Sequence, residues 1–220
     1  MPRSSLSSAL LAGAAAAALC ASNAAAQSSA PKPAEPPAAA FERRGGFALG
    51  LLAGAAFGTA SGNPKALAYR LDPTRETNLV NAYGYRITPF VGGAITNWFT
   101  VGLGLSFGRM QTAWDHATNV TTFVFHLEAF PLYTKGGMWR DVGLSADFGA
   151  GAASIRNTTT GKEVANAGVA SAAGVGAFWE PLRLWHVRAG PSFSYQHNWS
   201  EWFSRDDVTV GLRCILYGAP

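Results

Sequence analysis

The amino-acid sequence predicts an all-β protein, an eight-stranded antiparallel up-and-down barrel that crosses a membrane. Three observations predict this fold class: segments in which apolar residues alternate with small or polar ones, a composition poor in charge, and aromatic residues at the segment ends. Charged residues are 14% and hydrophobic residues 48% of the 220-residue chain, whereas ordinary soluble domains are about 25% charged. The apolar stretches after residue 26 are interrupted by glycine and polar residues, and a membrane-spanning helix needs roughly 20 apolar residues. Strands are therefore the elements expected to cross.

The residues before the alternating segments have the features of an export signal followed by a linker. Residues 1–26 combine a basic start, a short apolar stretch and an Ala-rich end, which is the pattern of a cleaved signal peptide. Residues 27–43 are rich in Pro and Ala, so we expect an extended or disordered linker there. The barrel domain is predicted over residues 44–217.

The alternating segments define eight predicted strands. They are residues 45–57, 84–96, 99–111, 120–133, 140–155, 166–179, 185–197 and 206–217. In the last one, Val208, Val210 and Leu212 share one face, while the other face carries small or polar residues and Arg213. Such period-two alternation indicates strands whose two faces meet different surroundings. The Gly-rich face carries too little charge for a water-exposed exterior, so we expect it to line a narrow interior and the apolar face to meet lipid.

The predicted connections alternate in length, which is the second signal for an outer-membrane barrel. The first, third, fifth and seventh are long, covering 58–83, 112–119, 156–165 and 198–205. The second, fourth and sixth are short, covering 97–98, 134–139 and 180–184. Short periplasmic turns and longer outer loops are the rule for these barrels, and an even strand number places both termini in the periplasm.

Tryptophan placement is the third signal. All seven tryptophans fall at predicted strand ends or in the adjoining connections, where amphipathic rings favour the headgroup level of a membrane. The predicted aromatic girdles contain Trp98, Trp139, Trp179 and Trp185 at the short connections and Trp114, Trp199 and Trp202 at the long ones.

On this pattern the chain resembles the eight-stranded outer-membrane barrels of the OmpA, OmpX and OmpW type. The resemblance covers residues 44–217 and rests on architecture. The C-terminal strand is its most specific local part, because Gly211, Cys214 and Leu216 resemble the signal that the barrel-assembly machinery reads. That group usually ends on Phe or Trp, whereas this chain continues from Tyr217 through Gly-Ala-Pro.

Several charged residues fall on the predicted inner face, because a charge that points into hydrocarbon costs about 2–4 kcal/mol for Lys or Arg. The predicted interior network consists of Arg86, His126, Glu128, Asp147, His186, Arg188 and Arg213. We expect Arg–carboxylate pairs that bridge the interior, and a gate formed by rearranging pairs is the alternative. His126 and Glu128 are two residues apart on one face. This spacing could begin a metal site, but without a third ligand we predict no metal and no cofactor.

These features predict an outer-membrane protein with a structural or surface-interaction role, no catalysis and an interior closed by side chains. A narrow channel for small or hydrophobic solutes is the alternative, in the manner that a resemblance to OmpW-type barrels implies. A lipid A-modifying hydrolase is less favoured: His197 and Ser200 match the residue types of lipid A deacylases but not their His-x-Ser-Asn spacing. A secreted or periplasmic soluble β protein is the non-membrane alternative.

The expected partners follow from this location. They are membrane lipids and lipopolysaccharide, with the barrel-assembly machinery and periplasmic chaperones during biogenesis. Lys65, Arg70 and Arg75 in the first long connection are candidates for contact with lipopolysaccharide phosphates. The net charge of +4 is a mild excess without a Lys/Arg cluster, so nucleic-acid binding has no support. We expect a monomer.

Overall fold

The computed structural model describes residues 46–64, 72–112, 115–135 and 137–218. The predicted signal peptide and linker lie outside these residues. The described part is built almost wholly from β-strands, joined by short connections that include three 3₁₀ turns. Within it, no helix has the length and apolar character needed to cross a membrane.

Eight long strands and one short strand form a single antiparallel sheet. The strands are β1 (Phe47–Gly62), β2 (Thr77–Thr96), β3 (Phe99–Gln111), β4 (His116–Ala129), β5 (Val142–Asn157), β6 (Glu163–Trp179), β7 (Leu182–Leu184), β8 (Val187–Ser200) and β9 (Phe203–Tyr217). Their order is β6-β5-β4-β3-β2-β1-β9-β8-β7, and a further pairing of β6 with β8 closes the sheet. The predicted all-β fold class, an eight-stranded antiparallel barrel, is therefore confirmed.

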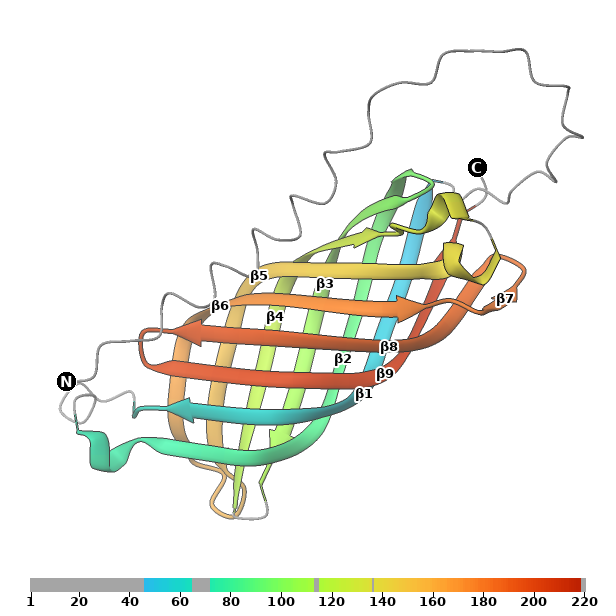
Figure 1. The fold of residues 1–220 in the computed structure, drawn as a ribbon. Helices are drawn as coiled ribbons and strands as arrows, with labels where there is room; N and C mark the ends of the chain where they lie inside the picture. Colours follow the sequence, from blue (N-terminus) through green and yellow to red (C-terminus); the bar gives the residue numbers. More distant parts are fainter. Residues whose placement is uncertain (1–45, 65–71, 113–114, 136, 219–220) are drawn as a thin grey trace, which may run out of the picture. The chain divides into compact units, whose positions relative to one another are not determined.

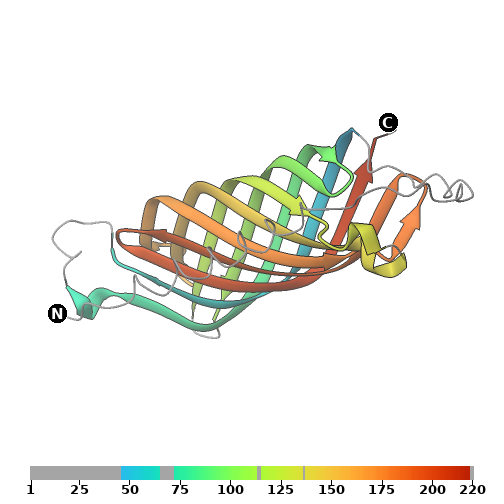
Figure 2. The same cartoon turned by 45° about the horizontal axis from the view of Figure 1, so that its top comes forward.

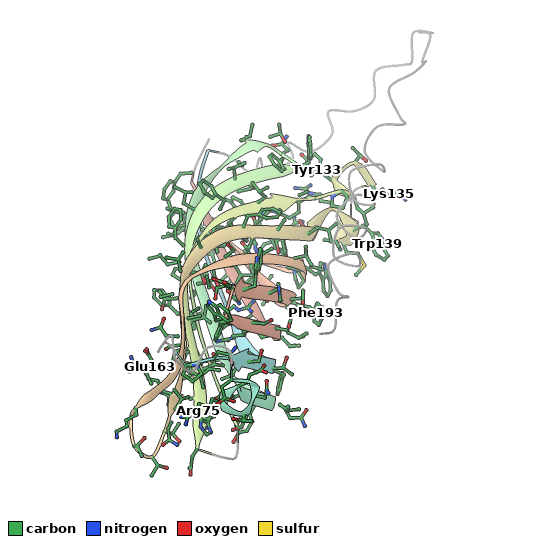
Figure 3. The ribbon with its side chains drawn as sticks, turned by 90° about the vertical axis from the view of Figure 1, so that its left-hand side faces the viewer. Arg75, Tyr133, Lys135, Trp139, Glu163 and Phe193 are labelled. Atoms are coloured by element: carbon green, nitrogen blue, oxygen red, sulfur yellow. The ribbon has the colours of Figure 1, made fainter. Side chains whose placement is uncertain are left out.

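The barrel has two distinct ends (Figures 1 and 2). We call the end that carries the start of β1 and the close of β9 the terminal end, and the opposite one the distal end. The terminal end also holds the 3₁₀ turns η3 (Tyr133–Lys135) and η4 (Gly137–Asp141) and the short strand β7. In Figure 3, Tyr133, Lys135 and Trp139 gather at this end, while Arg75 and Glu163 lie at the distal end.

Each predicted strand overlaps one of the eight long strands, but their ends differ, the short strand β7 lies in a predicted connection, and the predicted alternation of connection lengths is wrong. The distal connections cover only 63–76, 112–115, 158–162 and 201–202, whereas the terminal ones cover 97–98, 130–141 and 180–186. Several strands run further toward the distal end than their apolar alternation extends, because a backbone ladder needs a hydrogen-bonding partner and not an apolar side chain. The predicted strand 120–133 stops at Ala129 instead, since Pro131 follows and begins a tight turn.

The two faces of the strands have the predicted assignment. On β3, Leu103, Leu105 and Phe107 face outward and are 40–45% exposed, while Gly104 and Ser106 between them are buried. Similar exposed apolar side chains occur on all eight long strands and form a belt around the barrel. Distal to this belt the outward positions become polar, as at Arg109 on β3 and Ser154 on β5.

Glycine on the inner face makes room for large side chains from other strands. A Cβ on Gly143 would lie 2.2 Å from the Cζ atom of the Phe178 ring, and one on Gly108 would lie 2.8 Å from the Nη2 atom of Arg205. The Gly-rich face is thus the counterpart of the bulky and charged residues that cross the interior. Packing in such an interior leaves no room for an added methyl group.

Candidate functional site in the barrel interior

A buried ion pair connects opposite walls of the barrel near its terminal end. Arg213 on β9 and Glu128 on β4 are both essentially inaccessible to solvent, and these two strands lie opposite each other in the closed order. The Arg213 Nη2 atom is 2.6 and 2.7 Å from the two Glu128 carboxylate oxygens, and its Nε atom donates to Oε1 at 2.9 Å. This forked geometry is the strong form of an Arg–carboxylate interaction.

His126 extends this ion pair toward β5. Its Nε2 atom is 2.9 Å from Glu128 Oε1, and its Nδ1 atom is 2.6 Å from Asp147 Oδ1. Because a carboxylate faces each ring nitrogen, both nitrogens serve as donors when the ring is positively charged. The imidazole also packs against the Phe90 ring, with 4.2 Å between the centroids. We call Arg213, Glu128, His126, Asp147 and Glu180 the terminal charge cluster.

Glu180 supplies the second carboxylate around Arg213. It follows the last residue of β6, is fully buried, and pairs with Arg213 Nη1. The Tyr217 hydroxyl donates to the same carboxylate at 3.4 Å. The Arg213 guanidinium also lies 4.1 Å above the centroid of the Phe178 ring, a favourable cation–π position. Arg213 is therefore surrounded by two carboxylates and an aromatic face.

A second group of charges lies at the terminal rim. Arg188 Nη1 on β8 is 3.3 Å from Asp141 Oδ1, and Arg183 on β7 pairs with the other oxygen of that carboxylate. Arg188 also lies 5.5 Å above the Tyr217 ring, which connects this group to the terminal charge cluster. Asp141 and Arg188 are buried, whereas Arg183 is partly exposed.

A smaller charged group lies closer to the distal end. Arg86 on β2 and Arg205 on β9 both pair with Asp207, with 3.1 Å between Arg205 Nε and Asp207 Oδ2. Arg205 also donates to the Gly108 carbonyl across the interior at 3.3 Å. All three charged side chains are buried, and we call them the distal charge cluster.

Beyond this cluster most of the buried side chains of the interior are apolar, with Thr118 as a polar exception. The distal apolar cluster is formed by buried residues from seven strands. They are Ala56, Ala60, Leu79, Ala82, Met110, Val120, Ala153, Ile155, Ala165, Ala170 and Phe203. Most of these side chains are small, and Phe203, Ile155, Leu79 and Met110 supply most of the volume.

The structure brings together most of the predicted interior network but not all of it. Glu128, His126, Asp147 and Arg213 share one cluster, Arg188 belongs to the rim group, and Arg86 belongs to the distal charge cluster. His186 was predicted on the inner face, but it lies in the turn before β8, half-buried, with its ring against Trp185 at 4.3 Å. The prediction extended β8 two residues too far, and a turn residue does not follow strand alternation.

The tryptophans predicted for the girdles divide between the two ends. Trp98, Trp139, Trp179 and Trp185 are all at the terminal end, in connections or at a strand end, and Trp185 is 84% exposed. Trp199 and Trp202 are at the distal end, close to the β8–β9 turn. Trp114 lies outside the described residues.

Sequence reasoning missed five charged residues that take part in these groups. They are Asp141, Glu180, Arg183, Arg205 and Asp207. A signal existed for the last two, because they share odd numbering with Arg213 on the same strand and so point the same way. Asp141 and Glu180 lie in connections, where no periodicity assigns a direction to a side chain.

The residues considered for hydrolysis do not converge. His197 Nδ1 is 2.8 Å from Asp206 Oδ1, and its ring stacks on Trp199 on the outer face of the barrel. Ser200 is three positions further along the same strand. An odd separation places two side chains on opposite faces of a strand, so Ser200 points away from His197.

Of the cations predicted to contact lipopolysaccharide, only Arg75 lies within the described residues. Its Nε atom is 3.5 Å from Asp72 Oδ2 in the first distal connection. The Thr74 hydroxyl and backbone amide both donate to Asp72, which lowers the pKa of this carboxyl below its ordinary value of 3.8. Arg75 and Asp72 are both accessible, so this pair is a surface interaction.

No protein-family model matches the chain, and no curated protein matches it. The fold is similar to that of Neisserial surface protein A, with a TM-score of 0.53 and 13% identity over 78% of this chain and 99% of that one. Weaker similarities are to Ail, the attachment invasion locus protein of Yersinia pestis (TM-score 0.48, 13% identity, 78% and 99% covered), and to the outer membrane protein OprG of Pseudomonas aeruginosa (0.40, 8%, 80% and 99%). The predicted resemblance to small outer-membrane barrels is thus confirmed as a resemblance of fold.

Proposed function

We propose that this chain is an outer-membrane barrel with a structural or surface-interaction role, no catalysis and an interior closed to solute flow. The belt of exposed apolar side chains is the observation that supports placement in a membrane. Phe125, Phe148 and Leu212 are each more than half exposed, and soluble monomers rarely expose contiguous apolar patches beyond a few hundred Å². With an even number of crossing strands, both strand termini lie on one side, and for an exported barrel that side is the periplasm.

Three successive layers of side chains support a closed interior. From the terminal end these are the terminal charge cluster, the distal charge cluster and the distal apolar cluster. An eight-stranded barrel is narrow enough for its own side chains to fill. An ion that entered would have to separate Arg213 from Glu128 and also displace apolar side chains such as Phe203.

A narrow water path remains the second candidate, because one observation favours it. Within the described residues, the buried hydroxyls of Thr118, Thr122 and Thr209 have no hydrogen-bond partner. Buried hydroxyls usually bond to ordered water when no protein group is available. Thr122 and Thr209 lie on the inner face between the two charged groups, and Thr118 lies level with Ile155 of the distal apolar cluster, so a few internal waters are compatible with either function.

Membrane placement is tested by expressing the full chain in a Gram-negative host and fractionating its envelope. We expect the protein in the outer-membrane fraction, resistant to extraction by plain buffer, with gel mobility that changes on boiling. Extraction by plain buffer, without the mobility change, would contradict the proposal.

Absence of catalysis is tested on the lipid itself. We expect the lipid A mass profile of the host to be the same with wild-type protein and with a His197→Ala variant. Removal of an acyl chain by the wild type that disappears in the variant would establish a hydrolase instead.

A further inference from the structure

The outer surface of the barrel carries a polar pocket just beyond the apolar belt at the distal end. This pocket has a volume of about 420 Å³, and its lining includes Arg109 on β3, Asn119 on β4, and Ser154 and Arg156 on β5. It lies outside the interior clusters and opens directly to the surroundings of the barrel. The features described so far do not assign it a role.

Strand register brings the two arginines of this pocket onto one outward surface. Arg109 is opposite Asn119, and Asn119 is opposite Ser154 in the next strand. Arg156 is two residues beyond Ser154, so it points outward like Ser154. Because β4 lies between them and adjacent strands are about 4.8 Å apart, the strands of the two arginines are roughly 9.6 Å apart. Two long guanidinium side chains can reach a shared ligand in the pocket across that distance.

The apolar belt begins next to this pocket, on the side of the terminal end. On the outer face of β3, Phe107 lies two residues from Arg109 on the side of the terminal end, and it is 40% exposed. On β4, Phe123 is 45% exposed. A molecule held at the arginines would therefore extend along an apolar wall. This combination of a cationic pocket and an adjoining apolar wall fits an amphiphile with an anionic head.

The carboxylates near this pocket do not neutralise it. Glu163 Oε2 is 4.0 Å from Arg156 Nη2, and both side chains are largely accessible, so the pair contributes little. Glu163 also accepts a hydrogen bond from Asn166 at 2.7 Å. Asp115 lies in the β3–β4 connection, and its backbone carbonyl accepts a hydrogen bond from the Thr158 amide. Both arginines remain exposed.

We propose that Arg109 and Arg156 bind a phosphate group of an outer-leaflet lipid, with the Asn119 amide as a further donor. Arginine presents paired donors that match phosphate oxygens, and the acyl chains of the lipid lie along Phe107 and Phe123. This inference rests on the proposed outer-membrane placement. It assigns lipopolysaccharide-type phosphate to the strand surface, in addition to the predicted contact of the first distal connection.

The test uses the full mature barrel folded into vesicles of phosphatidylcholine doped with bis-phosphorylated lipid A. The protein is then extracted in detergent, and the lipid A that remains bound is quantified by mass spectrometry. Wild type is compared with Arg109→Gln, Arg156→Gln and their combination. Lys135→Gln is the control, because it removes an exposed cation at the terminal end, on the opposite side of the apolar belt from the pocket. Boiling-dependent gel mobility reports, separately, whether each variant forms a barrel.

We expect the double variant to form a barrel and lose most of the bound lipid A, while Lys135→Gln keeps it. Dephosphorylated lipid A is expected to be retained poorly by every protein. Equal loss in Lys135→Gln, full retention by the double variant, or equal retention of the dephosphorylated lipid would each overturn the inference. Displacement of lipid A by soluble inorganic pyrophosphate at low concentration would overturn its assignment to lipid. Failure to form a barrel at all would instead count against the proposed function.

Discussion

The two ends of the barrel interior are filled by different chemistry on the same strands. β9 supplies Arg213 to the terminal charge cluster and Phe203 to the distal apolar cluster. A buried charge depends on a specific partner on another strand, and loss of that partner leaves it uncompensated. An apolar side chain needs only neighbours of suitable volume, so changes there are graded. The terminal end should therefore fail abruptly on single substitutions, and the distal end in proportion to the volume removed.

The largest effect is expected from Glu128→Ala. This change leaves Arg213 buried with one carboxylate partner fewer and removes one of the two carboxylate partners of His126, so we expect a loss of about 3–5 kcal/mol in the free energy of unfolding. Urea unfolding in lipid vesicles, followed by tryptophan fluorescence, measures it. Ser145→Ala is the control, because Ser145 lies opposite Glu128 on β5 and carries no charge. A cost for Glu128→Ala no greater than that of the control would contradict the comparison.

At the distal end, volume should decide the cost. Ile155 is fully buried in the distal apolar cluster, so Ile155→Ala should destabilise the barrel by about 2–5 kcal/mol and Ile155→Val by about 0.5–1.5 kcal/mol. The same unfolding assay measures both. If the two variants lost equal stability, the cluster would not be packed in the graded way that distinguishes it from the terminal end.

A smaller effect is expected at the edge of the terminal charge cluster. The Asp147 side chain is 21% exposed, in contrast to the fully buried His126 and Glu128. Asp147→Asn keeps the size of the side chain and removes its charge, so we expect a cost of about 1.5 kcal/mol, at the lower end for hydrogen bonds to charged groups. If Asp147→Asn lost as much free energy of unfolding as Glu128→Ala, the partial exposure of Asp147 would not reduce the cost of removing its charge.

The smallest effect is expected outside the barrel wall, at the 3₁₀ turn Pro73–Arg75. Hydrogen bonds from Thr74 lower the pKa of Asp72 below its ordinary value of 3.8, so Asp72 supports the turn while it is ionised. That support is present above the ordinary value and is lost as the pH falls through the lowered pKa. The Thr74 amide resonance should shift in that range in an NMR titration. An Asp72→Asn variant should show no such shift, and an unchanged Thr74 resonance in the wild type would contradict the role of Asp72.

The sequence was sufficient for the fold because the alternation of Leu103, Leu105 and Phe107 with small residues is a local property of one strand. It also gave the inward direction of Arg213 and Glu128 for the same reason. It could not show that these two residues meet, because their pairing depends on closure of the sheet between β6 and β8. The inward direction of Glu180 and Asp141 could not be predicted, because residues in connections do not follow the two-residue alternation of a strand.

Strand ends were the least predictable feature. The alternation of apolar and polar residues fades beyond Phe57 on β1, yet the ladder with β9 continues to Gly62. Backbone hydrogen bonds sustain a strand outside the apolar belt, where side chains carry no hydropathy signal. The pocket at Arg109 and Arg156 was missed for this reason, because Arg156 lies beyond the end of the predicted strand.

Conductance of the refolded protein in a planar bilayer tests most directly whether the interior is closed. Wild type, Arg86→Ala and Glu128→Ala are recorded side by side. We predict no discrete conductance steps from any of them, because each substitution opens one layer and leaves the distal apolar cluster in place. Small steps from the wild type that change in amplitude or frequency in either variant would contradict a closed interior and establish a pore gated by these charges.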